Sequence, residues 1–321
     1  MIGCARPGPA AQFEAARRGT GQARTVTPRP TGARATDARA RDVMARVART
    51  FDLAVRLLPG DLRRDVRRLY LVLRTLDDLA DHAGPDQADQ GQAGARVRIA
   101  QVERWARGSP ADGPEAAILA DLADRYPGFP RDAVADLCAG LRTDLDGARL
   151  ATDADLERYC YCVAGTVGRM MAALLGVVPG HEAEADRAAR ALGAAMQRTN
   201  ILRDIVEDAS RGRVYLPATR LAAHGIAATP ATLAALARWD PRARAALLRE
   251  QIALADADYA TGLAGIRLLQ RGRWAVAAAA VLYREILRQI ERDGLGRDTR
   301  RAVVPRRRKL ALLVRLPRAL A

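Results

Sequence analysis

Carboxylates spaced four residues apart are the first feature of this sequence that could do chemistry. Asp77 and Asp81 stand at this spacing, and Arg74 and Tyr70 precede Asp77 by three and seven residues. Side chains at such intervals project from one face of a helix. Two carboxylates on one face repel each other by roughly 0.2–0.5 kcal/mol, so a bound cation would stabilise them. Taken alone, this face is more simply interpreted as a solvated acidic surface.

A second stretch repeats this geometry among apolar residues. One helix face would carry the side chains of Gln197, Asn200, Asp204 and Asp208, with Glu207 beside them. The positions between them are taken by Ile201, Leu202, Ile205 and Val206. Polar groups with apolar neighbours need partners when they are buried. Two such faces in one chain favour a functional site over simple packing.

The chemistry that fits these two faces is the binding of a diphosphate through a hard metal ion. Carboxylates on facing helices, with positions left for water and substrate oxygens, suit Mg²⁺. Guanidinium groups bind phosphate oxygens in a bidentate manner. The nearby arginines are Arg74, Arg203, Arg211 and Arg213. The sequence has neither a P-loop nor a strand-linked dinucleotide fingerprint, so we expect a diphosphate attached to a hydrophobic substrate.

The composition predicts that all-α elements position these side chains. Hydrophobic residues make up 49% of the 321 residues and aromatic residues only 4%, and Ala and Leu dominate. This balance favours helices over strands. Periodicity and Gly, Pro or Asp breaks predict helices at about 61–81, 95–107, 114–125, 130–149, 153–176, 182–208, 217–224, 230–238, 241–270 and 272–293.

The two ends of the chain differ from this helical middle. Residues 1–40 are rich in Pro, Gly, Thr, Ala and Arg, and we expect a basic, disordered leader. Residues 41–312 would form the helical domain, and 313–321 a basic and apolar tail. From Leu295 onward, arginines alternate with leucines and valines. This pattern predicts a last helix docked on the core, with contact to an anionic membrane as the alternative.

Charge and cysteine usage narrow the class of partner and the compartment. The formal net charge is +15, yet Lys309 is the only lysine, and no nucleic-acid-binding motif or aromatic stacking platform is present. We therefore expect no nucleic-acid partner. The four cysteines, Cys4, Cys138, Cys160 and Cys162, do not have zinc-site spacing. Reduced thiols predict a cytoplasmic protein, with peripheral membrane contact as an option, and nothing in the sequence indicates a particular oligomeric state.

Four stretches of the chain resemble motifs of the squalene/phytoene synthase family. Residues 70–81 (YLVLRTLDDLAD) resemble its first D-x-x-x-D helix, and residues 159–168 (YCYCVAGTVG) its central helix. Residues 197–208, continued by RGRVYLP at 211–217, resemble its second metal motif and the loop that follows. Tyr283, within LYREIL, matches a late helix. The resemblance covers about residues 42–312.

This resemblance implies an isoprenoid synthase fold, in which a single helical domain surrounds a central hydrophobic cavity. It implies metal ligation by Asp77, Asp81, Asn200, Asp204 and Asp208. It implies catalytic roles for Tyr70, Arg74, Tyr159, Arg203 and Tyr283. It implies substrate binding by Phe51, Arg74, Val163, Gly168, Gln197, Asn200, Arg213 and Tyr215.

The resemblance also implies a reaction. Two prenyl diphosphates, farnesyl or geranylgeranyl, would be joined head to head through a cyclopropylcarbinyl diphosphate. Mg²⁺, or Mn²⁺ in its place, would assist diphosphate release, and NADPH would be needed only if the product is squalene instead of dehydrosqualene or phytoene. Two alternatives stay open: a repurposed family member that cyclises or hydrolyses a single prenyl diphosphate, and a non-catalytic lipid- or membrane-binding protein.

Overall fold

The computed structural model describes residues 32–47, 55–56, 58–82, 89–298 and 300–320. Within these ranges, the side chains of 32–34, 45–47, 81–82, 89–90 and 317–320 are not described. Phe51 therefore lies outside the described residues, and of Asp81 only the helical backbone is described. No strand occurs in the described part of the chain, where only two isolated bridges, Arg149 with Val214 and Val177 with Leu269, are present. The all-α prediction is confirmed.

The main helices are α2 (Gly32–Val47), α4 (Gly60–His82), α5 (Asp89–Ala106), α6 (Pro114–Arg125), α7 (Arg131–Leu145), α8 (Asp153–Cys160), α9 (Thr166–Leu175), α10 (Glu182–Ser210), α11 (Ala218–Ala223), α12 (Pro230–Ala234), α13 (Pro241–Ala264), α14 (Arg273–Arg292) and α15 (Arg306–Leu320). Three short elements join them: the π-helix η1 (Tyr161–Gly165) and the 3₁₀ helices η2 (Leu236–Arg238) and η3 (Gly265–Leu268).

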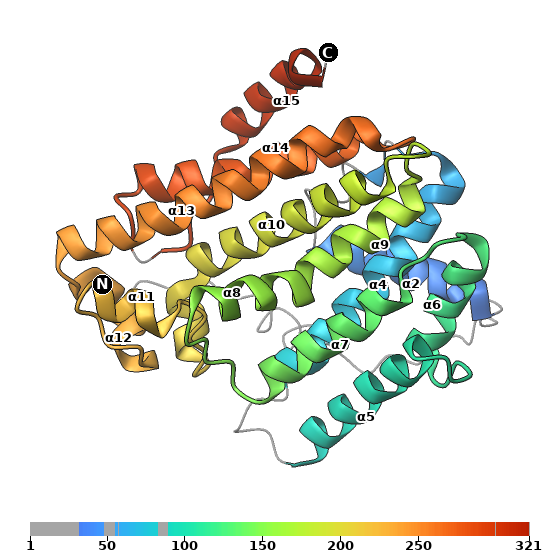
Figure 1. The fold of residues 1–321 in the computed structure, drawn as a ribbon, viewed down its shortest axis with the longest axis horizontal. Helices are drawn as coiled ribbons and strands as arrows, with labels where there is room; N and C mark the ends of the chain where they lie inside the picture. The colour runs from blue at the N-terminus through green and yellow to red at the C-terminus, as the bar shows by residue number, and fades with distance from the viewer. Residues whose placement is uncertain (1–31, 48–54, 57, 83–88, 299, 321) are drawn as a thin grey trace, which may run out of the picture.

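Helix α10 is the central element of the fold. It packs against α13 and α14 on one side and against η1 and α9 on the other (Figure 1). Helices α4 and α7 pack against α9, and α5 and α6 cover them from the far side. The long helix that carries the second aspartate motif is thus enclosed by neighbours along most of its length.

Two hydrophobic clusters make up most of the core, and the two aspartate motifs belong to different ones. Leu69, Leu76 and other residues of α4 pack in a cluster with side chains of α5, α6, α7 and α9. Ile201 and Ile205 of α10 pack in a second cluster with α8, α13 and α14. Since α4 and α10 contribute to separate clusters, their polar faces can meet at the boundary between the clusters.

Close backbone packing brings α9 and α10 together. A Cβ atom at Gly168 would lie 2.1 Å from the carbonyl oxygen of Ala189, and one at Gly193 would lie 2.2 Å from that of Ala164. Real Cβ atoms do not approach oxygen so closely, so only glycine fits at either position without a shift of the backbone. The small residues of the 159–168 motif are therefore explained in part by packing.

The helix boundaries differ from the predictions most clearly within the central motif and at the start of α2. The expected helix at 153–176 is interrupted by the π-helix η1, within the central motif. Helix α2 begins at Gly32, so its first residues lie in the segment predicted as leader; there Ala40 is fully buried and Asp37 pairs with Arg68 at 2.5 Å. The last helix, α15, docks on α14.

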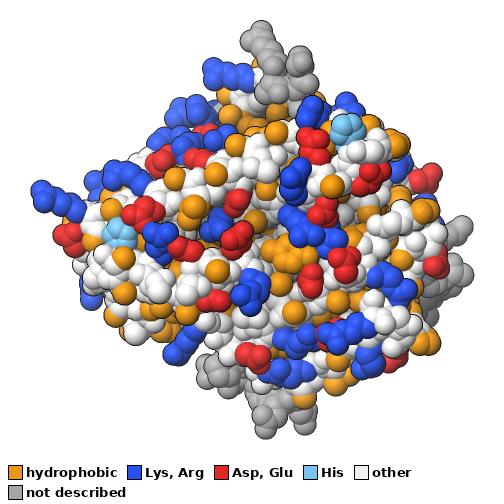
Figure 2. Space-filling model, viewed as in Figure 1, with side chains coloured by type: hydrophobic (Ala, Val, Ile, Leu, Met, Phe, Trp, Pro, Cys, Tyr) orange, Lys and Arg blue, Asp and Glu red, His pale blue; other side chains and the backbone are white. Residues whose placement is uncertain are grey.

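The surface carries interleaved charges. On the face shown in Figure 2, basic and acidic side chains lie beside one another instead of forming a single basic patch. Local pairing is also found at the part-buried Arg169, which forms ion pairs with both Asp132 and Asp186 at 2.7 Å. On this face much of the positive charge is thus paired locally.

Candidate active site

The first aspartate motif lies on the last two turns of α4. Arg74 forms ion pairs with Asp77 at 3.0 Å and with Asp78 at 2.5 Å, because residues three and four apart share a helix face. Asp77 and Asp78 are 52% and 40% exposed, so both carboxylates remain open to solvent. Asp78 was not among the predicted site residues, although its position after Asp77 placed it within reach of Arg74.

The second motif lies on α10, where the helix is kinked. Asp204 has non-helical backbone angles, φ −110° and ψ 16°, inside an otherwise continuous helix. Its carboxylate is held by Arg203 at 2.5 Å and by Arg301 at 3.0 Å. Arg301 comes from the segment between α14 and α15, a contact that sequence spacing does not reveal. In this arrangement two guanidinium groups balance the charge of Asp204.

Asp208 lies one turn beyond Asp204, and its surroundings disfavour its charge. Burial, followed by repulsion from Asp204, raises the pKa of the Asp208 carboxyl to about 7. Arg211 and Arg213 lower it by a smaller amount. A carboxyl with this pKa is one that a divalent cation would stabilise strongly in its ionised form.

Asn200 supplies direct support for a ligand at this site. Its Oδ1 atom is buried and has no hydrogen-bond partner in the described structure, while its Nδ2 group donates to Gln197 Oε1 at 3.3 Å. An orphaned amide oxygen close to carboxylates is the donor type that Mg²⁺ prefers. The oxygen donors on this face therefore fit a hard divalent ion.

The described side chains do not yet form a closed metal site. Among them, no group of three or more His, Cys, Asp or Glu residues is arranged to hold a metal ion. Asp81, the second carboxylate of the first motif, is not among these side chains. Asp77 and Asp204 are instead paired with arginines. The metal roles of Asp77, Asp81, Asn200, Asp204 and Asp208 therefore remain a prediction.

Tyrosines from two helices lie beside the polar face. Burial raises the pKa of Tyr70 to about 12, and Tyr70 interacts electrostatically with Tyr283 of α14. Tyr283 in turn accepts a hydrogen bond from Arg203, which contributes to the raised pKa of that arginine. The structure thus brings Tyr70, Arg203 and Tyr283 together from α4, α10 and α14, and their catalytic roles stay a prediction.

A second tyrosine cluster contains a residue that sequence reasoning missed. The rings of Tyr159 and Tyr215 stack with centroids 4.9 Å apart. The hydroxyl groups of both donate to Asp144 Oδ1, at 2.9 Å and 2.7 Å. The Asp144 carboxylate and burial both raise the pKa of the two phenols. Asp144 lies on α7, outside every motif, and no sequence signal pointed to it.

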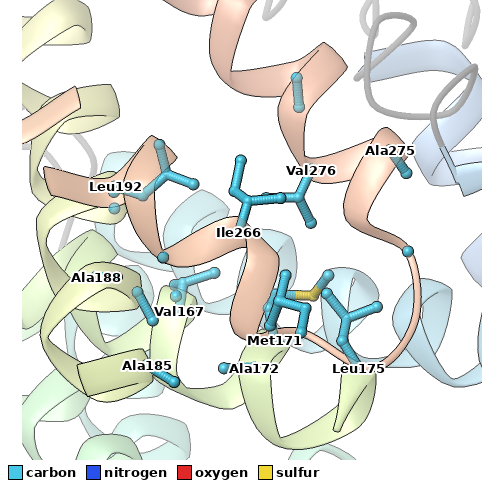
Figure 3. Close-up of a pocket in the computed structure, with 18 of the residues that line it drawn as sticks. Val167, Met171, Ala172, Leu175, Ala185, Ala188, Leu192, Ile266, Ala275 and Val276 are labelled. Carbon is cyan, nitrogen blue, oxygen red and sulfur yellow. The ribbon is translucent and has the colours of Figure 1, made fainter. Parts of the chain in front are cut away.

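An apolar cavity of about 240 Å³ lies beside the polar face (Figure 3). Its walls come from η1, α9, α10, α13, η3 and α14, and Val55 and Leu58 also line it. Met196 lines it, and Asn200 follows one turn later on α10; Ala279 lines it, and Tyr283 follows one turn later on α14. Two helices therefore lead from an apolar cavity directly to polar site residues.

One of the predicted substrate-binding residues lines this cavity and others do not. Gly168 lies in its wall. Val163 is not part of that wall and packs instead close to Gly140 of α7. Arg213 and Tyr215 are 8% and 6% exposed and are engaged with Ala80 and Asp144. Their roles in binding substrate remain predictions.

Fold and site together define an all-α protein in which the polar residues Asn200 and Tyr283 follow an apolar cavity by one helical turn. Residues 44–308 match the squalene/phytoene synthase family. The chain is 40% identical over 263 residues to the phytoene synthase of Thermus thermophilus, covering 79% of this chain and 82% of that one. It is 37% identical to the 15-cis-phytoene synthase of Synechococcus elongatus, covering 84% and 88%. A crystal structure of a dehydrosqualene synthase superposes with a TM-score of 0.76 at 28% identity, covering 90% and 97%.

The chain belongs to the squalene/phytoene synthase family. It is a prenyltransferase of the kind that condenses two prenyl diphosphates head to head, and the comparisons give no support to a cyclase or to a non-catalytic lipid-binding protein. Members of the family use a divalent metal ion and prenyl diphosphate substrates. Across the described residues, no helix has the length and apolar character required to cross a bilayer.

Proposed function

We propose that this enzyme joins two molecules of geranylgeranyl diphosphate to form phytoene. The relatives reported above at 37–40% identity are phytoene synthases, whereas the dehydrosqualene synthase is 28% identical. The observation that carries the proposal is the adjacency of the apolar cavity and the polar site residues on α10 and α14. A prenyl tail in the cavity would place its diphosphate beside Asn200 and Tyr283, one turn away.

The arginines would bind the diphosphate. Arg74 and Arg203 now pair with carboxylates of the two motifs, and both have planar guanidinium groups that bind phosphate oxygens in bidentate fashion. When a diphosphate arrives, these groups would exchange carboxylate for phosphate oxygens. Of the carboxylates that they release, Asp77 and Asp204 are predicted metal ligands, so substrate and metal would bind together.

Mg²⁺ is the metal that we propose, with Mn²⁺ as a substitute. When bound, it supplies Lewis-acid stabilisation of the leaving diphosphate, and Asp77, Asp81, Asn200, Asp204 and Asp208 would hold it. The walls of the cavity would exclude water, which would otherwise capture a carbocation as an alcohol. Because phytoene forms by proton loss, we expect no requirement for NADPH.

The test is product analysis. Purified protein is incubated with Mg²⁺ and either farnesyl or geranylgeranyl diphosphate, with and without NADPH, and the organic extract is analysed by mass spectrometry. We expect a forty-carbon product from geranylgeranyl diphosphate in equal yield with and without NADPH. A thirty-carbon product made only from farnesyl diphosphate would show that farnesyl diphosphate is the substrate instead. Products no larger than one substrate would overturn head-to-head coupling.

A peripheral position at the inner face of the cell membrane also remains a prediction. It is supported by the apolar nature of the substrate tails and of the product, which has no diphosphate left to keep it in water.

A further inference from the structure

Helix α15 presents an apolar stripe to solvent. Leu310 and Val314 are 65% and 71% exposed, and Val303, just before the helix, is 69% exposed. Leu310 and Val314 are four residues apart and so share one face of α15. The opposite face is docked: Leu316 is 3% exposed and Leu313 is partly buried against α14 and η3. The outward stripe is therefore not required for packing of the fold.

Basic side chains flank this stripe. Arg306, Arg307 and Arg315 are exposed on α15, and Lys309 is partly exposed; the helix contains no acidic residue. Arg308 is excluded from this group because it pairs with Glu285 of α14 at 2.9 Å. Helix α15 lies at the upper edge of the molecule, beyond α14 (Figure 1).

The docked face of α15 touches the wall of the substrate cavity. Leu313 and Leu316 belong to a small hydrophobic cluster that includes Ile266 and Val276. Ile266 and Val276 also line the cavity (Figure 3). A single layer of side chains therefore separates α15 from the space proposed for the prenyl tails.

An exposed tryptophan extends the same surface. Trp274 is 37% exposed at the start of α14 and directly precedes the cavity-lining Ala275. It lies four and seven residues before Ala278 and Val281, which belong to the same hydrophobic cluster as Leu313 and Leu316 of α15, and so falls on the same face of α14. Tryptophan at the edge of an apolar surface is typical of the membrane–water interface.

We infer that α15, together with Trp274, docks this enzyme on an anionic lipid bilayer and turns the cavity wall at Ile266 and Val276 toward it. An apolar stripe flanked by unpaired positive charge is the pattern of helices that lie in the bilayer interface. The charge favours anionic lipids, because juxtamembrane Lys and Arg are attracted to a negative surface potential. The membrane docking does not depend on which substrate the enzyme uses. The passage of prenyl tails and product between bilayer and cavity through this wall rests on the proposed function.

The experiment is vesicle flotation of the full chain. Vesicles of phosphatidylcholine alone are compared with vesicles that contain phosphatidylglycerol, at low salt and at about 0.5 M salt, where surface attraction is screened. We expect binding to the anionic vesicles that is at least tenfold stronger than to the neutral ones and is lost at high salt. Val314→Asp should weaken binding at least tenfold, and so should the triple variant Arg306→Gln, Arg307→Gln, Lys309→Gln.

Val97→Asp is the matched control. Val97 is 57% exposed on α5, on the far side of the molecule from α15, and its substitution should leave vesicle binding unchanged. All variants should retain wild-type turnover of detergent-dispersed substrate, which shows that they are folded. Failure of the wild-type protein to bind anionic vesicles, or equal loss in Val97→Asp and Val314→Asp, overturns the docking surface.

Two further outcomes separate the hypotheses. If the stripe instead mediates self-association, light scattering will show a dimer that Val314→Asp converts to a monomer, and the membrane assignment fails. If vesicle binding behaves as expected but no forty-carbon product forms, the docking surface stands and the substrate assignment fails.

Discussion

The guanidinium group of Arg213 donates a hydrogen bond to the backbone carbonyl oxygen of Ala80, 3.1 Å away. Ala80 directly precedes Asp81, and Arg213 follows Asp208 by five residues. The bond therefore joins the end of the first aspartate motif to the end of the second. Both residues are buried, at 3% and 8% exposure, so water cannot replace either partner easily. Arg213 thus links the two motifs and helps to set the distance between them.

Arg213→Ala should lower both stability and activity. We expect a loss of about 1–3 kcal/mol in the free energy of unfolding, because the buried carbonyl of Ala80 would lack a donor. We expect kcat/KM to fall at least tenfold, since the two motifs would no longer be held in register. Denaturant unfolding and steady-state kinetics measure the two effects. Arg267→Ala, at a surface arginine that is 71% exposed, is the control and should change neither.

The double variant Asp77→Ala, Asp204→Ala tests the metal assignment. We expect activity to fall roughly a hundredfold or more, since loss of even outer-shell partners of a metal costs 10–100-fold. The fold should survive, because Asp77 is half exposed, Arg301 is 48% exposed and can turn toward solvent, and Arg203 keeps its hydrogen bond to Tyr283. Circular dichroism and calorimetric titration with Mg²⁺ check both points. Asp112→Ala, at a surface carboxylate that is 63% exposed, should behave as wild type; turnover retained by the double variant would refute the assignment.

Sequence reasoning succeeded where the signal was local. The helical spacing of Asp77 with Arg74, and of Asn200 with Gln197, predicted contacts that the structure contains. Periodicity also located the long central helix within a few residues. Such contacts depend only on the 3.6-residue repeat, which the sequence displays directly.

Features that depend on distant contacts were not predictable. Asp144 reaches Tyr215 across 71 residues and Arg301 reaches Asp204 across 97, and neither lies in a motif. The π-helix at residues 161–165 and the kink at Asp204 place an irregular backbone inside regular helical patterns. Irregularities of this kind often occur at functional sites, where tertiary packing overrides local preference.

Metal binding should depend on pH through Asp208. Its pKa is raised to about 7, chiefly by burial, so below pH 7 the group is mostly protonated in the metal-free protein. In the metal-free protein, the stability that Asp208 contributes is fully present below about pH 4, the ordinary carboxyl value, and is lost as the pH rises through 7. A metal ion needs the ionised form. We therefore expect Mg²⁺ affinity, measured by calorimetry, to rise up to tenfold per pH unit below 7 and to level off above it.

Asp208→Asn is the diagnostic variant for this effect. It cannot ionise, so its weaker Mg²⁺ affinity should be independent of pH between about 6 and 8. Asp112→Asn should keep the wild-type profile. A flat profile in the wild-type protein would show that Asp208 does not control metal binding.

Asp144→Asn should disturb both tyrosines of the second cluster. The amide retains one acceptor oxygen in place of two and loses the charge that raises the pKa of Tyr159 and Tyr215. We expect a loss of about 1–3 kcal/mol in unfolding free energy and a several-fold lower kcat. Asp146→Asn is the matched control: this carboxylate lies two residues away, is 62% exposed and pairs with Arg96, so its loss should have little effect. Equal effects of the two substitutions would contradict a special role for Asp144.

Gly168→Ala should narrow the substrate cavity and loosen the packing of α9 on α10. The added Cβ atom would lie 2.1 Å from the carbonyl oxygen of Ala189, so the two helices must separate, at a cost of about 1–3 kcal/mol in stability. Because Gly168 lines the cavity, we expect kcat/KM for geranylgeranyl diphosphate to fall more than that for the shorter farnesyl diphosphate. Gly94→Ala, in open space on α5, should be neutral or stabilise by up to about 1 kcal/mol. An equal fall for both substrates would mean that Gly168 serves helix packing alone and does not limit the length of the prenyl tail.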